Sequence, residues 1–74
     1  MKIDLASLGT TELRKTLKWR RRPRWLLIRR RGERLLLEIV RVRPWSKGFY
    51  QVELEDGTKY AVPPSQRVRV LVAP

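Results

Sequence analysis

The sequence contains no cysteine and no histidine, and both absences restrict its chemistry. Without cysteine, no disulfide can staple this small domain and no thiolate can bind a metal. The sequence also shows no nucleophile–base pair and no glycine loop of the kind that cradles phosphates. We therefore expect a non-catalytic protein that uses no cofactor, no metal and no small-molecule substrate.

Long apolar runs are absent as well. The longest are short segments such as residues 25–28 and 35–37, whereas a membrane-spanning helix needs about 20 apolar residues. The opening residues Met1 to Asp4 lack the apolar region of a signal peptide. We therefore expect no membrane partner and a cytoplasmic location, with association with the nucleoid as one setting.

Acidic residues are few, so the chain carries a large positive charge. Its 74 residues include 18 Lys and Arg but only 7 Asp and Glu, which gives a net charge of +11. A chain of this length forms one domain with a thin core. A field of this size attracts polyanions, of which nucleic acid is the commonest and an acidic protein surface or an anionic membrane is rarer.

The N-terminal part predicts one helix. Thr10 is a suitable N-cap, and Leu13 and Leu17 are spaced as i and i+4 on one face of a helix. Pro23 would end the helix, because proline lacks the backbone N–H that the helix needs. We predict a short basic α-helix over about residues 10–22.

After that segment the apolar residues alternate with polar ones, which predicts half-buried β-strands. Asp56-Gly57 predicts a two-residue hairpin turn with positive φ at both positions. Five short strands with tight connections indicate a mainly β fold, with a small antiparallel barrel over residues 24–74. The expected strands are residues 25–30, 34–43, 50–55, 59–62 and 67–72.

The C-terminal part resembles an SH3-like barrel. The resemblance rests on Trp45-Ser46-Lys47-Gly48, on residues 52–57, on Tyr60-Ala61-Val62-Pro63-Pro64 and on Val68-Arg69-Val70. These segments are similar to the C-terminal DNA-binding domain of retroviral-type integrases, and the resemblance implies a five-stranded fold that binds DNA. The chain departs from that family after the proline, where the family has consecutive basic residues and this chain has Pro64-Ser65-Gln66.

The candidate binding residues are concentrated in an arginine-rich segment. Between Arg14 and Arg34 there are eleven basic residues and one acid. The arginine side chain presents a fork of N–H donors that fits phosphate, and tryptophans interleave with these arginines as on many nucleic-acid-binding surfaces. A solvated face is the alternative, but the mutual repulsion of these cations favours a polyanion partner. The predicted nucleic-acid-binding residues are Lys18, Trp19, Arg20, Arg21, Arg22, Arg24, Arg29, Arg30, Arg31, Arg34, Trp45 and Lys47.

The three tryptophans have different expected environments. Trp25 belongs in the core of a small barrel, while exposure and burial are equally consistent with Trp19. Trp45 follows Pro44 in a loop, where it either stacks on a base or covers the open end of the barrel.

The basic residues of the C-terminal half have acidic neighbours. Arg41 and Arg43 share one face of their strand, and Glu53 and Glu55 occupy the next strand, which predicts cross-strand ion pairs. A further basic pair near the C-terminus, Arg67 and Arg69, either pairs with the same acids or extends the basic surface.

Together these patterns favour a nucleic-acid-binding module that contacts the phosphate backbone, with DNA slightly favoured over RNA through the resemblance. The alternative is a small protein-interaction module or accessory subunit that binds an acidic surface of RNA polymerase or of a ribonucleoprotein. A large exposed apolar patch beside the charges would favour this alternative, because phosphate binding needs none. Membrane-surface binding by residues 13–25 is disfavoured, because the apolar stripe is too narrow.

Overall fold

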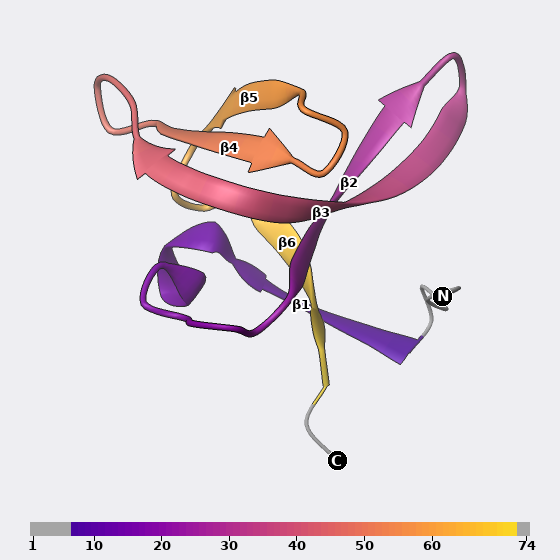
Figure 1. Ribbon diagram of the computed structural model, residues 1–74, viewed down its shortest axis with the longest axis horizontal. Helices are drawn as coiled ribbons and strands as arrows, with labels where there is room; N and C mark the ends of the chain where they lie inside the picture. Colours follow the sequence, from indigo (N-terminus) through magenta and orange to yellow (C-terminus); the bar gives the residue numbers. More distant parts are fainter. Residues whose placement is uncertain (1–6, 73–74) are drawn as a thin grey trace.

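The computed structural model describes residues 7–72, which form a single antiparallel sheet of six strands (Figure 1). The order of the strands is β1-β6-β2-β3-β4-β5, and the sheet is not closed, because β1 and β5 are its unpaired edges. The mainly β prediction is confirmed, but the closed barrel of five strands is not formed. The strands are β1 (Leu8–Glu12), β2 (Arg24–Arg30), β3 (Glu33–Pro44), β4 (Tyr50–Leu54), β5 (Lys59–Val62) and β6 (Arg67–Leu71).

The long strand β3 organises the fold, because it belongs to two ladders. Its first half pairs with β2 and its second half pairs with β4. The register shifts between Ile39 and Arg41, which marks a β-bulge at the point where the strand passes from one partner to the other. A bulge bends a strand and increases its twist, and β3 is visibly curved in Figure 1. The bend lets the two halves of the sheet face each other across a small core.

The core is built from inward-facing side chains at alternating positions along the strands, as the period of two predicts. On β6, for example, Val68 and Val70 are buried while Arg67 is exposed. The chain between β1 and β2 adds Leu13, which has no exposed surface. The residues of the buried cluster are Leu13, Leu26, Ile39, Val52, Leu54, Val62, Val68 and Val70.

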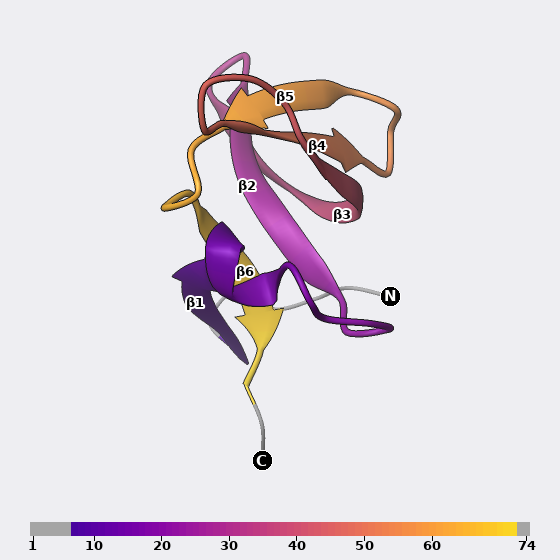
Figure 2. The same ribbon diagram turned by 90° about the vertical axis from the view of Figure 1, so that its left-hand side faces the viewer.

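The predicted helix over residues 10–22 is wrong. The N-terminal half of that segment is extended and forms β1, which pairs with β6 through contacts such as Thr11 with Val68. Only one 3-10 turn follows, η2 (Leu13–Thr16), and it lies beside β1 and β6 (Figure 2). Leu13 and Thr16 are buried at a spacing of three, which suits a 3-10 turn, whereas Leu17 is 38% exposed. Pairing with β6 therefore overrode the helical pattern.

The β4–β5 turn differs from its predicted geometry. Gly57 has a φ of +88°, but Asp56 is not among the described residues with positive φ. The Gly57 N–H donates to the Leu54 carbonyl and the Leu54 N–H donates to the Thr58 carbonyl, both at 2.8 Å. These bonds define a three-residue loop in which a turn is followed by a glycine bulge, rather than the predicted two-residue turn.

The β2–β3 turn is a two-residue turn with positive φ at both positions, the geometry predicted for Asp56-Gly57 in the β4–β5 hairpin. Arg31 and Gly32 have φ values of +51° and +79°, and Arg30 and Glu33 are paired on either side. Two adjacent residues with positive φ form a type I′ turn, which matches the twist of the flanking strands. This turn therefore holds an arginine at the tip of the hairpin.

Candidate nucleic-acid interface

The loop of residues 17–23, which we call the arginine loop, joins η2 to β2 and carries the densest group of cations. Lys18, Arg20, Arg21 and Arg22 are all exposed. Trp19 is half-buried and packs against the core. It therefore anchors a loop whose charged side chains extend into solvent.

Two features fix the geometry of the arginine loop. The Arg22 guanidinium carbon lies 3.7 Å from the centroid of the Trp19 ring, a cation–π contact that holds the guanidinium plane against the ring. Arg21 has a φ of +60°, a left-handed conformation that costs a non-glycine residue about 1–2 kcal/mol. Arg31 and Lys47, in the turns that carry the other two groups of cations, also have positive φ, so each of the three groups includes a residue of this kind.

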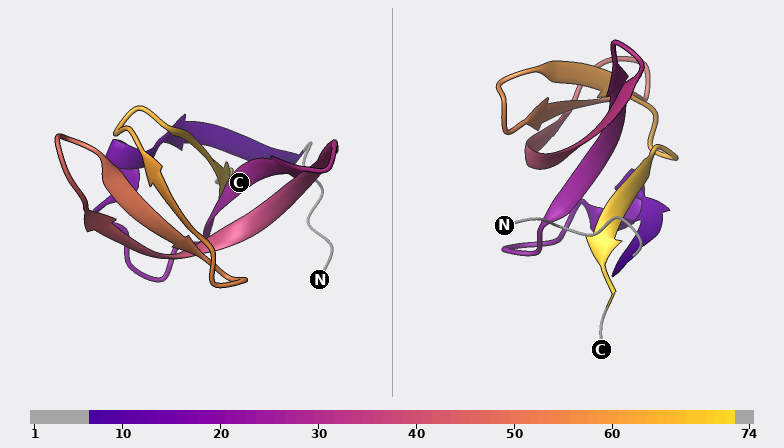
Figure 3. Two further views of the ribbon diagram at one scale, coloured as in Figure 1. Left: turned by 90° about the horizontal axis from the view of Figure 1, so that it is seen from above. Right: turned by 90° about the vertical axis from the view of Figure 1, so that its right-hand side faces the viewer.

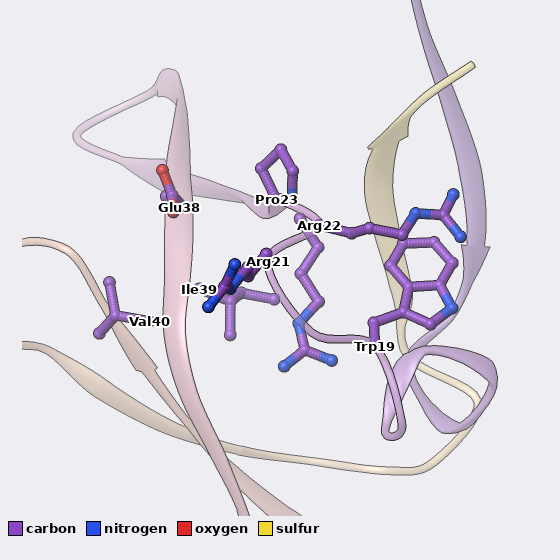
Figure 4. A pocket seen from close by; sticks show the side chains of 8 residues that line it. Trp19, Arg21, Arg22, Pro23, Glu38, Ile39 and Val40 are labelled. Atoms are coloured by element: carbon purple, nitrogen blue, oxygen red, sulfur yellow. The ribbon is translucent and has the colours of Figure 1, made fainter. Parts of the chain in front are cut away.

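A cavity of about 420 Å³ lies between the arginine loop and the middle of β3. Figure 4 shows Arg22 against the Trp19 ring on one side, and Glu38 and Val40 of β3 on the other. Cationic groups therefore dominate the cavity, with one carboxylate opposite. The lining residues are Trp19, Arg21, Arg22, Pro23, Arg24, Glu38, Ile39 and Val40.

Arg24 differs from its neighbours because it is committed to the fold. Its Nη1 donates at 2.7 Å to both the carbonyl and the side-chain oxygen of Thr16. Thr16 is fully buried, and its hydroxyl in turn donates to the Leu13 carbonyl at 2.7 Å. Burial lowers the pKa of the Arg24 guanidinium. Arg24 thus joins η2 to the start of β2. Although it also lines the cavity, its guanidinium is engaged by Thr16.

The hairpin of β2 and β3 carries a second group of cations at its far end. Arg29 lies directly opposite Arg34 in the ladder, and Arg31 occupies the turn. All three are exposed, and none has an ion-pair partner among residues 7–72. Like charges in directly opposite positions destabilise a sheet, so this pair is a structural cost that a bound anion would offset.

Arg30, at the same tip, is occupied by an intramolecular bridge. Its Nη2 lies 2.9 Å from Oδ2 of Asp56, and Tyr60 and Asp56 raise the pKa of Arg30. The Thr58 hydroxyl and N–H, together with Arg30, lower the pKa of Asp56 to about 2. This bridge ties the β2–β3 tip to the β4–β5 hairpin, and it leaves Arg30 less free to bind phosphate.

The third predicted group lies in the β3–β4 turn. Trp45 is 53% exposed and Lys47 is exposed with a φ of +51°, so Trp45 does not cover the core. Phe49, which the sequence pattern did not single out, is 45% exposed beside it. An alternation count continued from Gln51 back to Phe49 could have found this residue.

The expected cross-strand ion pairs of β3 and β4 are not made. Arg41 is opposite Glu53 in the ladder, but the two are not an ion pair in the described structure. The Glu55 carboxylate instead accepts the Glu38 N–H at 3.1 Å. Arg43 donates to the Gln51 side chain at 2.9 Å. The second ion pair among residues 7–72 joins Arg14 and Glu12.

The basic residues of β6, Arg67 and Arg69, do not lie opposite the acids of β4. Arg67 is opposite Glu12 and Arg69 is opposite Thr10 in the β1–β6 ladder, while Arg69 also faces Trp25 on β2. Trp25 is buried, as predicted. It lies on the other face of the sheet from Leu26, because neighbouring residues of a strand point to opposite faces. Arg67 and Arg69 therefore extend the basic surface away from the acids of β4.

The structure does not gather the twelve predicted residues into one patch. The arginine loop precedes β2 and the tip of the β2–β3 hairpin follows it, about 20 Å away for a strand of seven residues at 3.3 Å each. The β3–β4 turn lies at the opposite end of the molecule from that tip (Figures 1 and 3). The cations therefore form three separate groups around the rim of the sheet.

Comparisons with protein-family models, with curated proteins and with solved structures gave no significant match. Within residues 7–72, no helix is long and apolar enough to cross a membrane. The same residues contain no group of three acidic side chains placed to hold a metal ion. The features of the described residues that point to a function are therefore the exposed cationic and aromatic side chains.

Proposed function

We propose that this protein is a non-catalytic nucleic-acid-binding module that contacts the phosphate backbone through the arginine loop and the β2–β3 tip. The observation that carries the proposal is a set of exposed arginines without ion-pair partners in the described structure. A guanidinium fork binds phosphate through two parallel N–H donors. The arginines of the proposed contact are Arg20, Arg21, Arg22, Arg29, Arg31 and Arg34.

The spacing of these groups supports a polymer as the ligand. A single phosphate or nucleotide can occupy the cavity beside Trp19, but it cannot also reach the hairpin tip about 20 Å away, at the far end of β2. The same distance spans about six base-pair steps of a duplex at 3.4 Å each. A nucleic-acid backbone presents phosphates over that length and can neutralise both groups at once.

We further propose that the sheet is a partly open SH3-like barrel with one added edge strand. The bent β3, shared by two ladders, and the short turn between β5 and β6 support this assignment. The integrase-like mode of DNA contact has less support. The connector carbonyls of Pro64 and Gln66 accept the N–H groups of Arg14 and Leu13, so this connector holds η2 in place.

A second candidate function has one observation in its favour. Trp45 and Phe49 form an exposed apolar patch beside charged residues, which is the feature that a protein-interaction module would show. In that case the partner would be an acidic surface of RNA polymerase or of another nucleic-acid-processing complex. The charge of +11 fits such a surface as well as it fits nucleic acid.

A titration with duplex DNA, single-stranded DNA and duplex RNA at several salt concentrations tests the proposal. If about five phosphates are neutralised on a duplex, log K falls with log salt at a slope of about −4 to −5. A slope shallower than about −1 would refute phosphate contact as the basis of binding. Binding to an acidic protein without measurable binding to any of the three nucleic acids would favour the second candidate.

A further inference from the structure

The turn between β3 and β4 combines exposed aromatic rings with cations, and phosphate contact alone does not require this combination. Trp45 is 53% exposed and Phe49 is 45% exposed. The Trp45 N–H donates to the Phe49 carbonyl at 2.9 Å, so the two residues face each other across the hairpin. Exposing two aromatic side chains to water is unfavourable, so a ligand that covers both rings gains apolar burial.

Both rings lie on the solvent face of the hairpin. Arg43 is opposite Gln51 and bonds to it, and its guanidinium carbon lies 5.8 Å from the centroid of the Trp45 ring. Trp45 therefore shares the face of Arg43. Phe49 shares the same face, because it is two residues from Gln51 and side chains alternate along a strand.

Cations surround this aromatic pair. Arg43 lies over the ring of Trp45, and Lys47 occupies the turn itself. Farther along the same face, Arg41 and Lys59 flank Glu53 in adjacent strands. We call Arg43, Trp45, Lys47 and Phe49 the aromatic platform. The charged residues of the platform are both cations, and the nearest acid on this face, Glu53, lies outside the platform.

We propose that the aromatic platform binds the unpaired bases of a single-stranded nucleic acid, with its cations placed on the adjoining phosphates. This inference rests on the proposed function and specifies the form of nucleic acid that occupies one of the three groups. Base stacking on aromatic side chains combined with a basic groove is the general means by which proteins hold single strands. In a duplex the base faces are already stacked and the rings could not reach them.

Strand β3 runs from the cavity beside the arginine loop toward the platform. Val40 lines the cavity, and Arg41 and Arg43 follow it toward Trp45. The distance along the strand from Val40 to Trp45 is about 17 Å at 3.3 Å per residue. A single strand whose phosphates lie at the arginine loop can therefore follow β3 until its bases meet the two rings.

The test compares a fluorescently labelled 15-nucleotide oligo(dT) strand with a 15-base-pair duplex, by anisotropy, using the full chain. We expect Trp45→Ala and Phe49→Ala each to weaken single-strand binding by about 5- to 150-fold, the range for loss of one stacked base. Duplex binding should change less than two-fold, and Trp45→Phe should retain most of the single-strand affinity because it keeps a ring. Leu71→Ala, which truncates another half-exposed apolar side chain on β6, is the matched control and should leave both affinities unchanged.

The outcomes separate this inference from the proposed function. If the wild-type chain binds nucleic acid but Trp45→Ala weakens neither form, or weakens both equally, the stacking inference is wrong while the phosphate contact stands. If the wild-type chain binds neither form, both are wrong. Vesicles of anionic and neutral lipid are tested in parallel. If the wild-type chain binds them, and Trp45→Ala loses that binding but keeps its single-strand affinity, the platform binds a membrane and the inference is wrong. Thermal melts of each variant verify that it remains folded.

Discussion

The opposed arginines of the β2–β3 hairpin predict that a single substitution stabilises the fold and weakens binding at the same time. Arg29 and Arg34 are directly opposite and exposed, and neither has an acidic partner in the described structure. Arg34→Glu replaces a repulsion with an attraction at the same position. It also removes one proposed phosphate contact and places a carboxylate beside the phosphates.

The expected magnitude follows from the geometry of a sheet. Directly opposite Cβ atoms are about 5 Å apart, and cross-strand charge pairs change stability by about 0.2–1 kcal/mol. Two unit charges about 7 Å apart in water interact by roughly 0.6 kcal/mol, so reversing the sign gains about 1 kcal/mol. For a domain of this size, that gain raises the melting temperature by about 4–8 °C.

Thermal melts at about 20 mM and about 500 mM salt measure this gain. The stabilisation should be largest at low salt and should nearly disappear at high salt, where exposed charges are screened. Arg34→Gln is the matched control and should gain about half as much, because it removes the repulsion without adding an attraction. An Arg34→Glu protein that melts no higher than wild type at low salt, or whose gain persists at high salt, would refute the reasoning.

Three further substitutions test individual contacts. Arg24→Met should cost about 1–3 kcal/mol in a denaturant titration, because it leaves the buried oxygens of Thr16 without their donor; an unchanged midpoint would mean that Arg24 does not hold η2. Gly57→Val should cost about 1–2 kcal/mol, since valine is strained at positive φ, and Gly57→Asn should recover most of that loss; equal melts for both would show that the turn has another conformation. Asp56 has a pKa of about 2 in the folded state, below its ordinary 3.8. Its stabilising effect is therefore complete above about pH 4 and is lost as the pH falls toward 2, so Asp56→Asn should show a weaker loss of stability over that range in acid melts than wild type does.

Much of the strand pattern could be predicted from the sequence, because local alternation and turn residues define it. Strand β5 begins and ends where alternation placed it, β2 begins one residue earlier than predicted, and β3 is one residue longer at each end. The N-terminal segment could not be predicted in this way. Thr10 and Thr11 are extended because β6 offers them a pairing edge, and that edge is more than fifty residues away in the sequence.

The candidate site could be predicted by residue type but not by role. The abundance of arginine indicated a basic surface, and most of the predicted arginines are exposed. Arg24 and Arg30 have structural roles because Thr16 and Asp56 lie within reach only after folding. Phe49 was missed because it precedes the first residue of β4, although its alternation with Gln51 indicates the same outward face.

The most direct test of phosphate contact through the arginine loop is the slope of log K against log salt for duplex DNA in two matched variants. In one, Arg20, Arg21 and Arg22 become Gln; in the other, Arg67 and Arg69 become Gln. Each phosphate contact contributes about 0.9 to the slope, so the first variant should lose about two to three units and most of its affinity, and the second should lose less. Both should remain folded, because exposed substitutions change stability by about 0.5 kcal/mol or less. An unchanged slope in the first variant, or a larger loss in the second, would contradict the proposed role of the arginine loop.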